Sequence, residues 1–426
     1  MSNKTKNALT KHSAPQVEQP LIRFPEFRLS QPWTTELGSD IFDQVNDKDH
    51  NSDLPVLAVT QEHGAIPRDT INYHVSVADS SIEGYKVVEV GDFIISLRSF
   101  QGGIEFSKYR GICSPAYVIL RLKNGHSKEY FRHYLKTDRF IRQLTKNLEG
   151  LRDGKMISYK QFSELHLAIP SPEEQHCIAD CLSSLDELIE AEAAKLDALK
   201  TQKLGLMTNL LPSETETAPR LRFPEFQNSG NWQVERLEDL AKRGSGHTPS
   251  KSQSEYYGGG IKWISLADSK RLDAGLIENT ETEISPAGIR NSSAVLHPAG
   301  SVVLSRDAGV GKSAVMGVDM AVSQHFIVWT CKPDRLYNWF LYYSLQHRKP
   351  LFERIATGST IKTIGLPFFV DMRLALPTLP EQKMVADCLA SLDLRITAQA
   401  RRVEALKSHK KGLMQQLFPA LEGVQG

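Results

Sequence analysis

One segment of the chain occurs twice: LAIPSPEEQHCIADCLSSLDELIEAEAAKLDALKTQKLGLMTNLLP at residues 167–212 and LALPTLPEQKMVADCLASLDLRITAQARRVEALKSHKKGLMQQLFP at residues 374–419. The two copies align without a gap, and just over half of the aligned positions are identical. Chance does not produce a match of this length, so the chain contains one unit used twice.

Within each copy, apolar residues recur at alternating intervals of four and three residues, which is the heptad spacing of a coiled-coil seam. The first seam contains Ile178, Leu182, Leu185, Ile189, Leu196, Leu199, Leu206 and Leu210. The second contains Val385, Leu389, Leu392, Ile396, Val403, Leu406, Leu413 and Leu417. Polar residues interrupt both seams in the same register, at Glu192 and Lys203 and at Gln399 and Lys410. The spacing predicts two helices, each about 55–60 Å long and ended by a proline.

The matched registers favour packing of the two helices on each other as an intramolecular coiled coil. An antiparallel arrangement is expected, because it would relate the two halves by a pseudo-two-fold axis and point the domains apart. The alternative is two separate helices, each lying on its own domain.

The segments that precede the two helices also share their beginnings. RFPEF at residues 23–27 recurs at residues 222–226, and a tryptophan follows each copy, Trp33 or Trp232. Further on, GDFIIS at residues 91–96 parallels GSVVLS at residues 300–305, and each is expected to form a turn into a buried strand. The expected divisions are a disordered N-terminus (1–20), a first globular domain (21–170), a first helix (171–212), a linker (213–221), a second globular domain (222–377), a second helix (378–419) and a tail (420–426).

Each globular half mixes strand-like and helical patterns, which predicts an α/β fold in both. The strand-like runs are Leu54–Thr60, Val87–Leu97, Ala116–Leu122, Ile261–Ser265, Ser301–Ser305 and Phe326–Thr330. The helical runs are Ser127–Leu148 and Tyr337–Ile355. The helices repeat closely while the globular parts diverge, as expected of a symmetric scaffold that carries two different recognition domains.

Composition excludes several classes of protein. Lys and Arg total 51 against 50 Asp and Glu, so any basic surface must be local. The five cysteines are scattered, without a CxxC pair, which indicates an intracellular protein without a disulfide framework. The chain shows neither a signal peptide nor an apolar stretch long enough to span a membrane, so we expect it in the cytoplasm.

In the first half, polar and basic residues follow a predicted buried strand. Arginine can bond guanine and glutamine can bond adenine in a bidentate manner. The candidate DNA-binding residues of this half are Arg98, Ser99, Gln101, Lys108, Arg110, Arg152 and Lys155.

In the second half, Lys, Ser and Thr residues stand beside glycines, and such groups suit phosphate contact. The candidate DNA-binding residues are His247, Thr248, Ser250, Lys251, Tyr256, Arg306, Lys312, Ser359 and Lys362. For any single loop, solvated turn chemistry explains the composition equally well. The occurrence of such loops in both halves favours DNA.

No sequence motif supports a catalytic site. GVGKS at residues 309–313 is similar to a phosphate-binding loop, but Arg306 stands where the motif requires its first glycine. The triple glycine at residues 258–260 precedes a predicted strand rather than a helix, so it is no dinucleotide fingerprint. The chain also lacks the Asn-Pro-Pro-aromatic and Asp-Pro-Pro-Tyr elements with which amino-methyltransferases hold the target base.

The sequence resembles the specificity subunits of type I restriction–modification enzymes over nearly the whole chain after residue 20. The motifs that carry the resemblance are RFPEF and its copy, residues 167–170 with Glu174-Gln175, residues 374–377 with Glu381-Gln382, residues 247–250 with Tyr256 and Gly259, residues 261–264 and residues 304–307. No single motif is specific, whereas the two-fold succession of globular domain and helix is.

The resemblance implies two target-recognition domains, each of which reads one half of a bipartite site in double-stranded DNA. It implies helices that act as a spacer and as a docking surface for two methyltransferase subunits, which restriction subunits join. AdoMet, ATP and Mg²⁺ would be used by those partners, and no cofactor or metal is expected on this chain. Two other functions stay open from the residues alone: a stand-alone DNA methyltransferase and a coiled-coil scaffold for proteins only.

Overall fold

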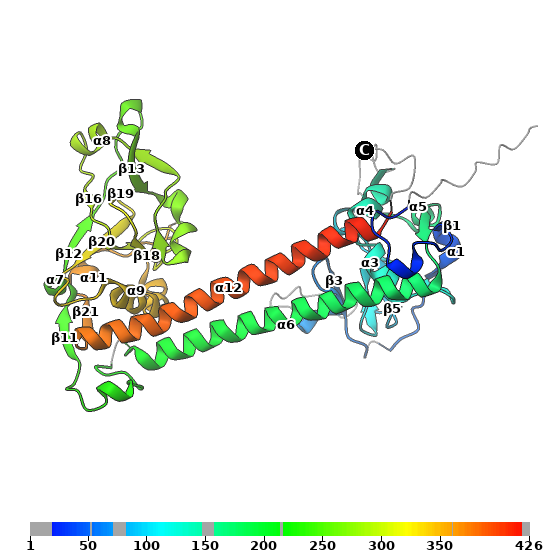
Figure 1. Ribbon diagram of the computed structural model, residues 1–426, viewed down its shortest axis with the longest axis horizontal. Coiled ribbons are helices and arrows are strands. Elements are labelled where there is room, and N and C mark those ends of the chain that lie inside the picture. The colour runs from blue at the N-terminus through cyan, green and yellow to red at the C-terminus, as the bar shows by residue number, and fades with distance from the viewer. Residues whose placement is uncertain are drawn as a thin grey trace, which may run out of the picture. The chain divides into compact units, whose positions relative to one another are not determined.

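The structure is a computed structural model that describes residues 19–51, 53–70, 82–146, 157–213, 216–359 and 361–419. The expected disordered N-terminus, except for its last two residues, and the expected tail lie outside the described residues. The chain divides into two compact units: the first is Met1–Ala193 with Arg401–Gly426, and the second is Ala194–Ala400. Each unit contains one mixed α/β domain and part of each of two long helices (Figure 1).

The two long helices are α6 (Pro172–Leu210) and α12 (Leu379–Leu417). The strands of the first domain are β1 (Thr34–Leu37), β2 (Phe42–Val45), β3 (Leu57–Thr60), β4 (Gly64–Pro67), β5 (Lys86–Val88), β6 (Phe93–Ile95), β7 (Glu105–Phe106), β8 (Gly111–Cys113), β9 (Val118–Leu122) and β10 (His166–Ile169). Its short helices are α1 (Gly38–Ile41), α2 (Ser99–Gly102), α3 (Lys128–Tyr134), α4 (Asp138–Thr145) and α5 (Tyr159–Ser163).

In the second domain, the described residues form more strands than in the first. They are β11 (Gln233–Arg236), β12 (Ala241–Ser245), β13 (Tyr257–Ile264), β14 (Leu276–Ile277), β15 (Thr282–Ile284), β16 (Leu296–His297), β17 (Val302–Ser305), β18 (Ser313–Met316), β19 (Met320–Val322), β20 (Phe326–Cys331) and β21 (Arg373–Leu376). Its short helices are α7 (Leu237–Leu240), α8 (Pro286–Arg290), α9 (Asn338–His347), α10 (Lys349–Ile355) and α11 (Leu366–Val370).

Both domains contain a sheet with the same strand order. The order is β2-β9-β6-β7 in the first domain and β12-β20-β17-β18 in the second, where β14 extends the edge. Neighbouring strands are antiparallel in both sheets, except that β14 runs parallel to β18. The repeated segments at residues 91–96 and 300–305 therefore contribute equivalent strands, β6 and β17, which confirms the expected shared frame.

Three runs were each predicted as one continuous element. This prediction is wrong, because each run forms two separate elements. The run Val87–Leu97 forms β5 and β6, because Gly91 turns the chain at φ +95°. The run Ser127–Leu148, described as far as residue 146, forms α3 and α4, because Thr137 starts a new helix by accepting a hydrogen bond from the Phe140 N–H. The run Tyr337–Ile355 likewise breaks into α9 and α10, and a proline occupies the first turn of α10.

The long helices match their prediction closely. Each has 39 residues, a length of about 58 Å at the α-helical rise. All predicted seam positions are buried or half-buried. In the first unit, Lys410 of α12 donates to Asp186 of α6 (Nζ to Oδ1, 2.5 Å). In the second unit, Lys203 of α6 donates to Asp393 of α12 at the same distance. These two contacts join residues at equivalent positions of the repeat.

The RFPEF motifs attach each domain to the start of a long helix. Arg23 donates from Nε and Nη2 to the two oxygens of Glu174, at 2.7 Å each. Arg222 makes the same pair of bonds to Glu381, at 2.8 and 2.6 Å. Each carboxylate is only 1% exposed, and bidentate geometry of this kind is strong and directional. The repeated motifs are therefore structural clamps.

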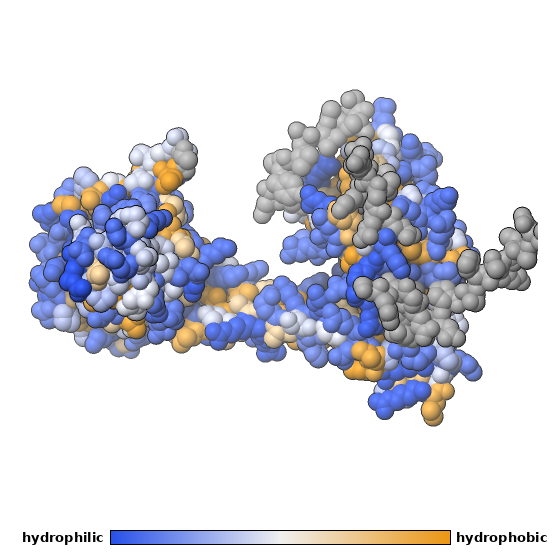
Figure 2. Space-filling view, turned by 90° about the horizontal axis from the view of Figure 1, so that it is seen from above, coloured by the Kyte–Doolittle hydropathy of each residue, from blue (hydrophilic) through white to orange (hydrophobic). Residues whose placement is uncertain are grey.

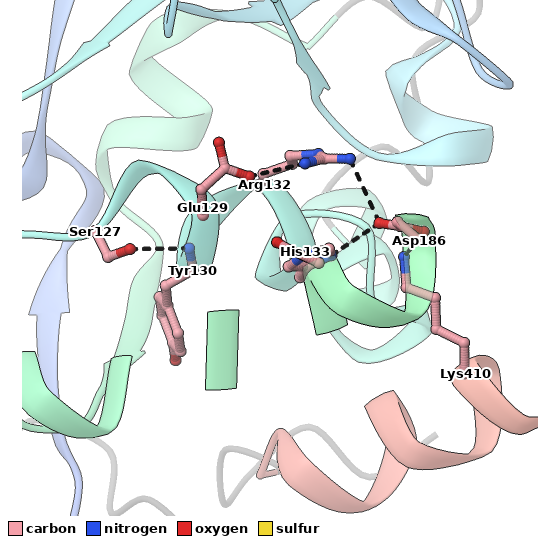
Figure 3. A network of polar contacts seen from close by, with 8 residues as sticks. Ser127, Glu129, Tyr130, Arg132, His133, Asp186 and Lys410 are labelled. Carbon is pink, nitrogen blue, oxygen red and sulfur yellow. Dashed lines mark hydrogen bonds and ion pairs between the residues drawn. The ribbon is translucent and has the colours of Figure 1, made fainter. Parts of the chain in front are cut away.

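A network around Asp186 connects α3 of the first domain to both helices (Figure 3). Arg132 bridges Glu129 (2.8 Å) and Asp186 (3.4 Å), and Lys410 reaches the same carboxylate. Burial, together with the nearby charges of Lys410 and Arg132, lowers the pKa of His133 to about 3. His133 is therefore neutral at physiological pH and contributes to packing.

Nothing in the described part of the chain forms a helix with the length and apolar character needed to cross a lipid bilayer.

Candidate nucleic-acid interface

In the second domain, several loops meet at one end of the central sheet. Ser245, the last residue of β12, pairs with Ile327 near the start of β20. Ser305, the last residue of β17, pairs with Phe326, the first residue of β20. Ser313, the first residue of β18, pairs with Leu304 of β17. The segments after β12 and β17 and before β18 and β20 therefore emerge together. We call this region the loop end of the second domain.

The loop end gathers most of the residues predicted in this half. His247, Ser250 and Lys251 follow β12 and are exposed, while Thr248 is half-buried. The backbone N–H of His247 donates to Val322 (3.0 Å), which fixes this loop against the end of β19. Tyr256 is half-buried and lies near the same loop, since the hydroxyl of the adjacent Tyr257 donates to Pro249 (2.6 Å).

Ser359 and Lys362 are brought to the loop end by backbone hydrogen bonds. The Ile364 N–H donates to the Arg306 carbonyl (3.0 Å), which anchors the segment containing both residues beside the exit of β17. Ser359 and Lys362 are exposed, whereas Arg306 is half-buried. Chain segments far apart in sequence thus offer polar groups on one surface, and this surface could be inferred only from the strand pairing.

Lys312 has a different environment from the one expected of a free phosphate contact. Its Nζ donates to Asp273 (2.7 Å) and to the Ser269 carbonyl (3.2 Å). Its side chain is 23% exposed. The glycine-rich turn that carries Lys312 joins β17 to β18 and precedes a strand rather than a helix, which agrees with the rejection of a phosphate-binding loop.

Gln324 and His325 also lie at the loop end and were not among the residues predicted from the sequence. The Thr248 hydroxyl donates to Gln324 Oε1 (2.6 Å), and His325 Nδ1 lies 2.8 Å from Asp307 Oδ2. The only signal available in the sequence was their position just before a buried strand. The equivalent residues of the first half are Pro115 and Ala116, so the repeat provided no hint.

In the first domain, the predicted residues fall into separate groups. Arg98 and Gln101 are exposed on and beside α2, directly after β6. Ser99 is 1% exposed, and its hydroxyl accepts a hydrogen bond from the Ser96 N–H (2.8 Å). Ser99 therefore stabilises the turn and does not face solvent, contrary to expectation. Arg152 and Lys155 lie outside the described residues.

Lys108 and Arg110 lie at the opposite end of the same sheet from Arg98. The register pairs Phe106, the end of β7, with Phe93, the start of β6, so the residues after β7 emerge away from α2. Both are exposed, and Arg110 forms an ion pair with Glu89 (3.0 Å). The structure therefore does not unite these residues with Arg98 and Gln101 in one surface.

Figure 2 shows one face of the molecule, on which hydrophilic residues predominate and hydrophobic residues form scattered patches. One pocket of about 700 Å³ lies in the first unit and has both basic and acidic side chains in its wall, including Lys108, Arg132, Lys136, Glu105 and Asp186. A wall of mixed charge differs from a uniformly basic phosphate channel.

Comparison with known proteins gives a consistent result. The family model described as the type I restriction modification DNA specificity domain matches the chain twice, at residues 43–201 and 229–408. The chain is 24% identical over 347 residues to the type I restriction enzyme MjaVIII specificity subunit of Methanocaldococcus jannaschii, covering 78% of this chain and 79% of that protein. It is 23% identical over 309 residues to the putative type I restriction enzyme MjaX specificity subunit of the same organism, covering 71% and 67% respectively.

Solved structures share the fold at low sequence identity. A chain from a study of complex assembly and conformational transition of the type I R-M system superposes with a TM-score of 0.58 at 16% identity, covering 92% of this chain and 99% of that one. The S subunit of a type I restriction-modification system from M. genitalium superposes with a TM-score of 0.54 at 14% identity, covering 95% and 100%. At these identities the likeness establishes the fold.

Proposed function

This chain belongs to the family of type I restriction–modification specificity subunits, and from that premise we propose how its two domains act. It is the non-catalytic subunit that recognises the DNA target of such a complex. Membership of this family does not favour the two alternatives, a stand-alone methyltransferase and a scaffold for proteins only.

Each domain reads one half of a bipartite target in double-stranded DNA. This proposal rests on one observation. The two domains contain sheets with the same strand order, but the loops of these sheets carry different side chains. After the equivalent strands β6 and β17, the first domain has the exposed Arg98 and Gln101, while the second has the half-buried Arg306 and the buried Asp307. Side chains that bond base edges determine sequence preference, so two domains with one frame and different loops suit two different half-sites.

The proposed contacts divide into two kinds. Arg98 and Gln101 are exposed and have the chemistry for bidentate bonds to guanine and adenine. Ser250, Lys251, Ser359 and Lys362 are exposed hydroxyl or ammonium groups, which suit phosphate oxygens. Lys108 and Arg110 remain candidate phosphate contacts, on a different face from Arg98.

The two long helices pair as an antiparallel coiled coil that sets the spacing between the half-sites. Two observations support this pairing: the residues of the heptad seam are buried or half-buried, and the ion pairs Asp186–Lys410 and Asp393–Lys203 join equivalent positions of the two helices. A target read by two domains on a rigid spacer has a fixed gap between its halves, as in dimeric DNA-binding proteins.

The complex also contains methyltransferase and restriction subunits. The helix and the clamp occur twice in nearly the same form, so the chain has two equivalent docking surfaces. This favours the binding of two methyltransferase subunits. AdoMet, ATP and Mg²⁺ are used by those partners. The methyltransferase must reach an adenine inside a duplex, so recognition is coupled to extrusion of that base.

The test is a map of N6-methyladenine in the genome of the source cell with and without this chain. The expected result is loss of one bipartite motif, with unequal halves and a fixed gap. Continued methylation of every motif in the absence of the chain, while the partner subunits are produced, would contradict the proposal.

A variant pair extends this test to the loop end. Combined Lys251→Ala and Lys362→Ala is expected to weaken binding to all sequences, because phosphate contacts carry little sequence information. Lys332→Ala is the matched control. Lys332 is exposed and follows β20 at the opposite end of the sheet, so its replacement should leave binding unchanged.

A further inference from the structure

Four polar side chains at the loop end of the second domain form a connected chain. The Thr248 hydroxyl donates to Gln324 Oε1 at 2.6 Å. Gln324 Nε2 lies 3.4 Å from His325 Nε2, and His325 Nδ1 lies 2.8 Å from Asp307 Oδ2. The four residues come from three separate loops, so only the folded sheet brings them together.

The inner end of this chain is fixed. Asp307 is 7% exposed, and the Arg306 N–H beside it donates to the His325 carbonyl (3.0 Å). The next residue, Ala308, adopts φ +38°, a left-handed conformation that is costly for a residue with a side chain. This tight turn holds the carboxylate against the imidazole, so the His325 ring has a set orientation.

The outer end of the chain faces solvent. Gln324 is exposed and the His325 side chain is 29% exposed. Because Nδ1 faces the Asp307 carboxylate, Nε2 lies on the side of the ring toward the Gln324 amide. The amide and the ring edge together present donors and acceptors whose positions are set before any ligand arrives.

The first domain has different chemistry at the same places. Alignment of Ser96 with Ser305 places Arg98 at the position of Asp307. Alignment of Tyr117 with Phe326 places Ala116 at the position of His325. The first domain thus has a cation where the second has the carboxylate of Asp307, and a methyl group where the second has the imidazole of His325.

We propose that Gln324 and His325, held by Thr248 and Asp307, read base edges in the half-site of the second domain. A glutamine amide matches the N6 and N7 positions of adenine in the major groove, and the oriented imidazole bonds an adjacent base. This inference rests on the proposed function, because it names the specificity determinant of one of the two domains.

The test uses the full chain assembled with methyltransferase subunits and a library of DNA duplexes in which both half-sites vary. In Gln324→Ala and His325→Ala, discrimination is expected to fall about 10- to 100-fold at one or two adjacent positions of one half-site. The other half-site is expected to be unchanged and acts as an internal reference. Gln233→Ala, an exposed glutamine on β11, is the matched control.

Asp307→Asn separates positioning from folding. It keeps the size of the side chain but weakens its hold on the ring, so the same base positions should lose discrimination without a change in melting temperature. A uniform loss of affinity for all sequences would assign these residues to phosphate contact and overturn the inference. An unchanged preference in all three variants would also overturn it. Absence of any bipartite preference in the unmodified complex would instead contradict the proposed function.

Discussion

Individual residues that recur in both halves hold the molecule together. Arg23 and Arg222 each form a bidentate pair with a buried carboxylate at the start of a long helix. The Trp232 indole N–H also donates to Glu381, at 3.2 Å. The repeated clamp residues therefore have a structural role, while the residues proposed to read DNA differ between the halves.

The clamp gives a prediction about stability. Glu381→Gln is expected to lower the free energy of unfolding of the second unit by about 2–3 kcal/mol, because the charge of Arg222 loses its buried partner. Urea unfolding measures the change. Glu281→Gln is the matched control, since Glu281 is 64% exposed in its pair with Arg271 and surface pairs contribute roughly 0–1 kcal/mol. Equal effects of the two variants would show that the clamp contributes no more than a surface pair.

His133 gives a prediction about pH. Burial lowers its pKa from about 6.5 to about 3, so the unfolded chain binds the proton more readily than the folded one. The contribution of neutral His133 is therefore complete above pH 6.5 and is lost as the pH falls toward 3. The slope below pH 6 approaches about 1.4 kcal/mol per pH unit.

The measurement compares unfolding of the unmodified chain and of His133→Gln at pH 7, 6 and 5. Glutamine keeps a polar group near Ser183, which lies 3.2 Å from His133 Nε2, but it does not titrate. The stability of the variant should fall less steeply with acidification. Parallel pH profiles would exclude His133 as the source of the slope.

Among the secondary-structure elements, the long helices were the most predictable. Their period, their proline ends and their polar interruptions are local properties, and α6 and α12 end within two residues of the predicted bounds. The shorter runs were less predictable. A glycine with positive φ at residue 91 and a threonine cap at residue 137 divided elements that apolar patterning had joined.

The contact between Lys203 and Asp393 gives a prediction for the helix pair. K203D and D393K should each destabilise the second unit, and K203D/D393K should recover part of the loss. The coupling energy is expected to be about 1 kcal/mol. Recovery is partial because the Tyr343 hydroxyl also donates to Asp393 (2.8 Å). The exposed pair Lys200–Asp197 within α6 is the control, and its coupling should be smaller. If the effects of the two single substitutions on stability were simply additive, this contact would no longer support pairing of the helices.

The molecule as a whole is modular in its proposed use. Exchange of residues 222–377 for the corresponding domain of another family member should change one half-site and keep both the other half-site and the gap. The reason is that each domain has its own core and its own sheet. Mapping of N6-methyladenine after the exchange provides the measurement. If neither half-site changed, or if both did, independent reading by the two domains would be wrong.

The candidate site could be predicted only in part. Arg98, Gln101, Lys251 and Lys362 were selected for their chemistry and are exposed. Ser99 was selected on the same grounds and is buried, because its hydroxyl closes a turn. Gln324 and His325 were missed, because their partners lie in other loops.

The sequence by itself determined the repeat, the two long helices with their seam, and the family. These features depend on the spacing and the identity of residues along the chain, so they can be recognised without knowledge of the packing. Only the tertiary structure decided which loops meet at the end of a sheet, which serine turns inward, and which histidine is held by a carboxylate. The reason is that strand register and side-chain contacts join residues distant in sequence, and the energy of each contact depends on groups that no local pattern contains.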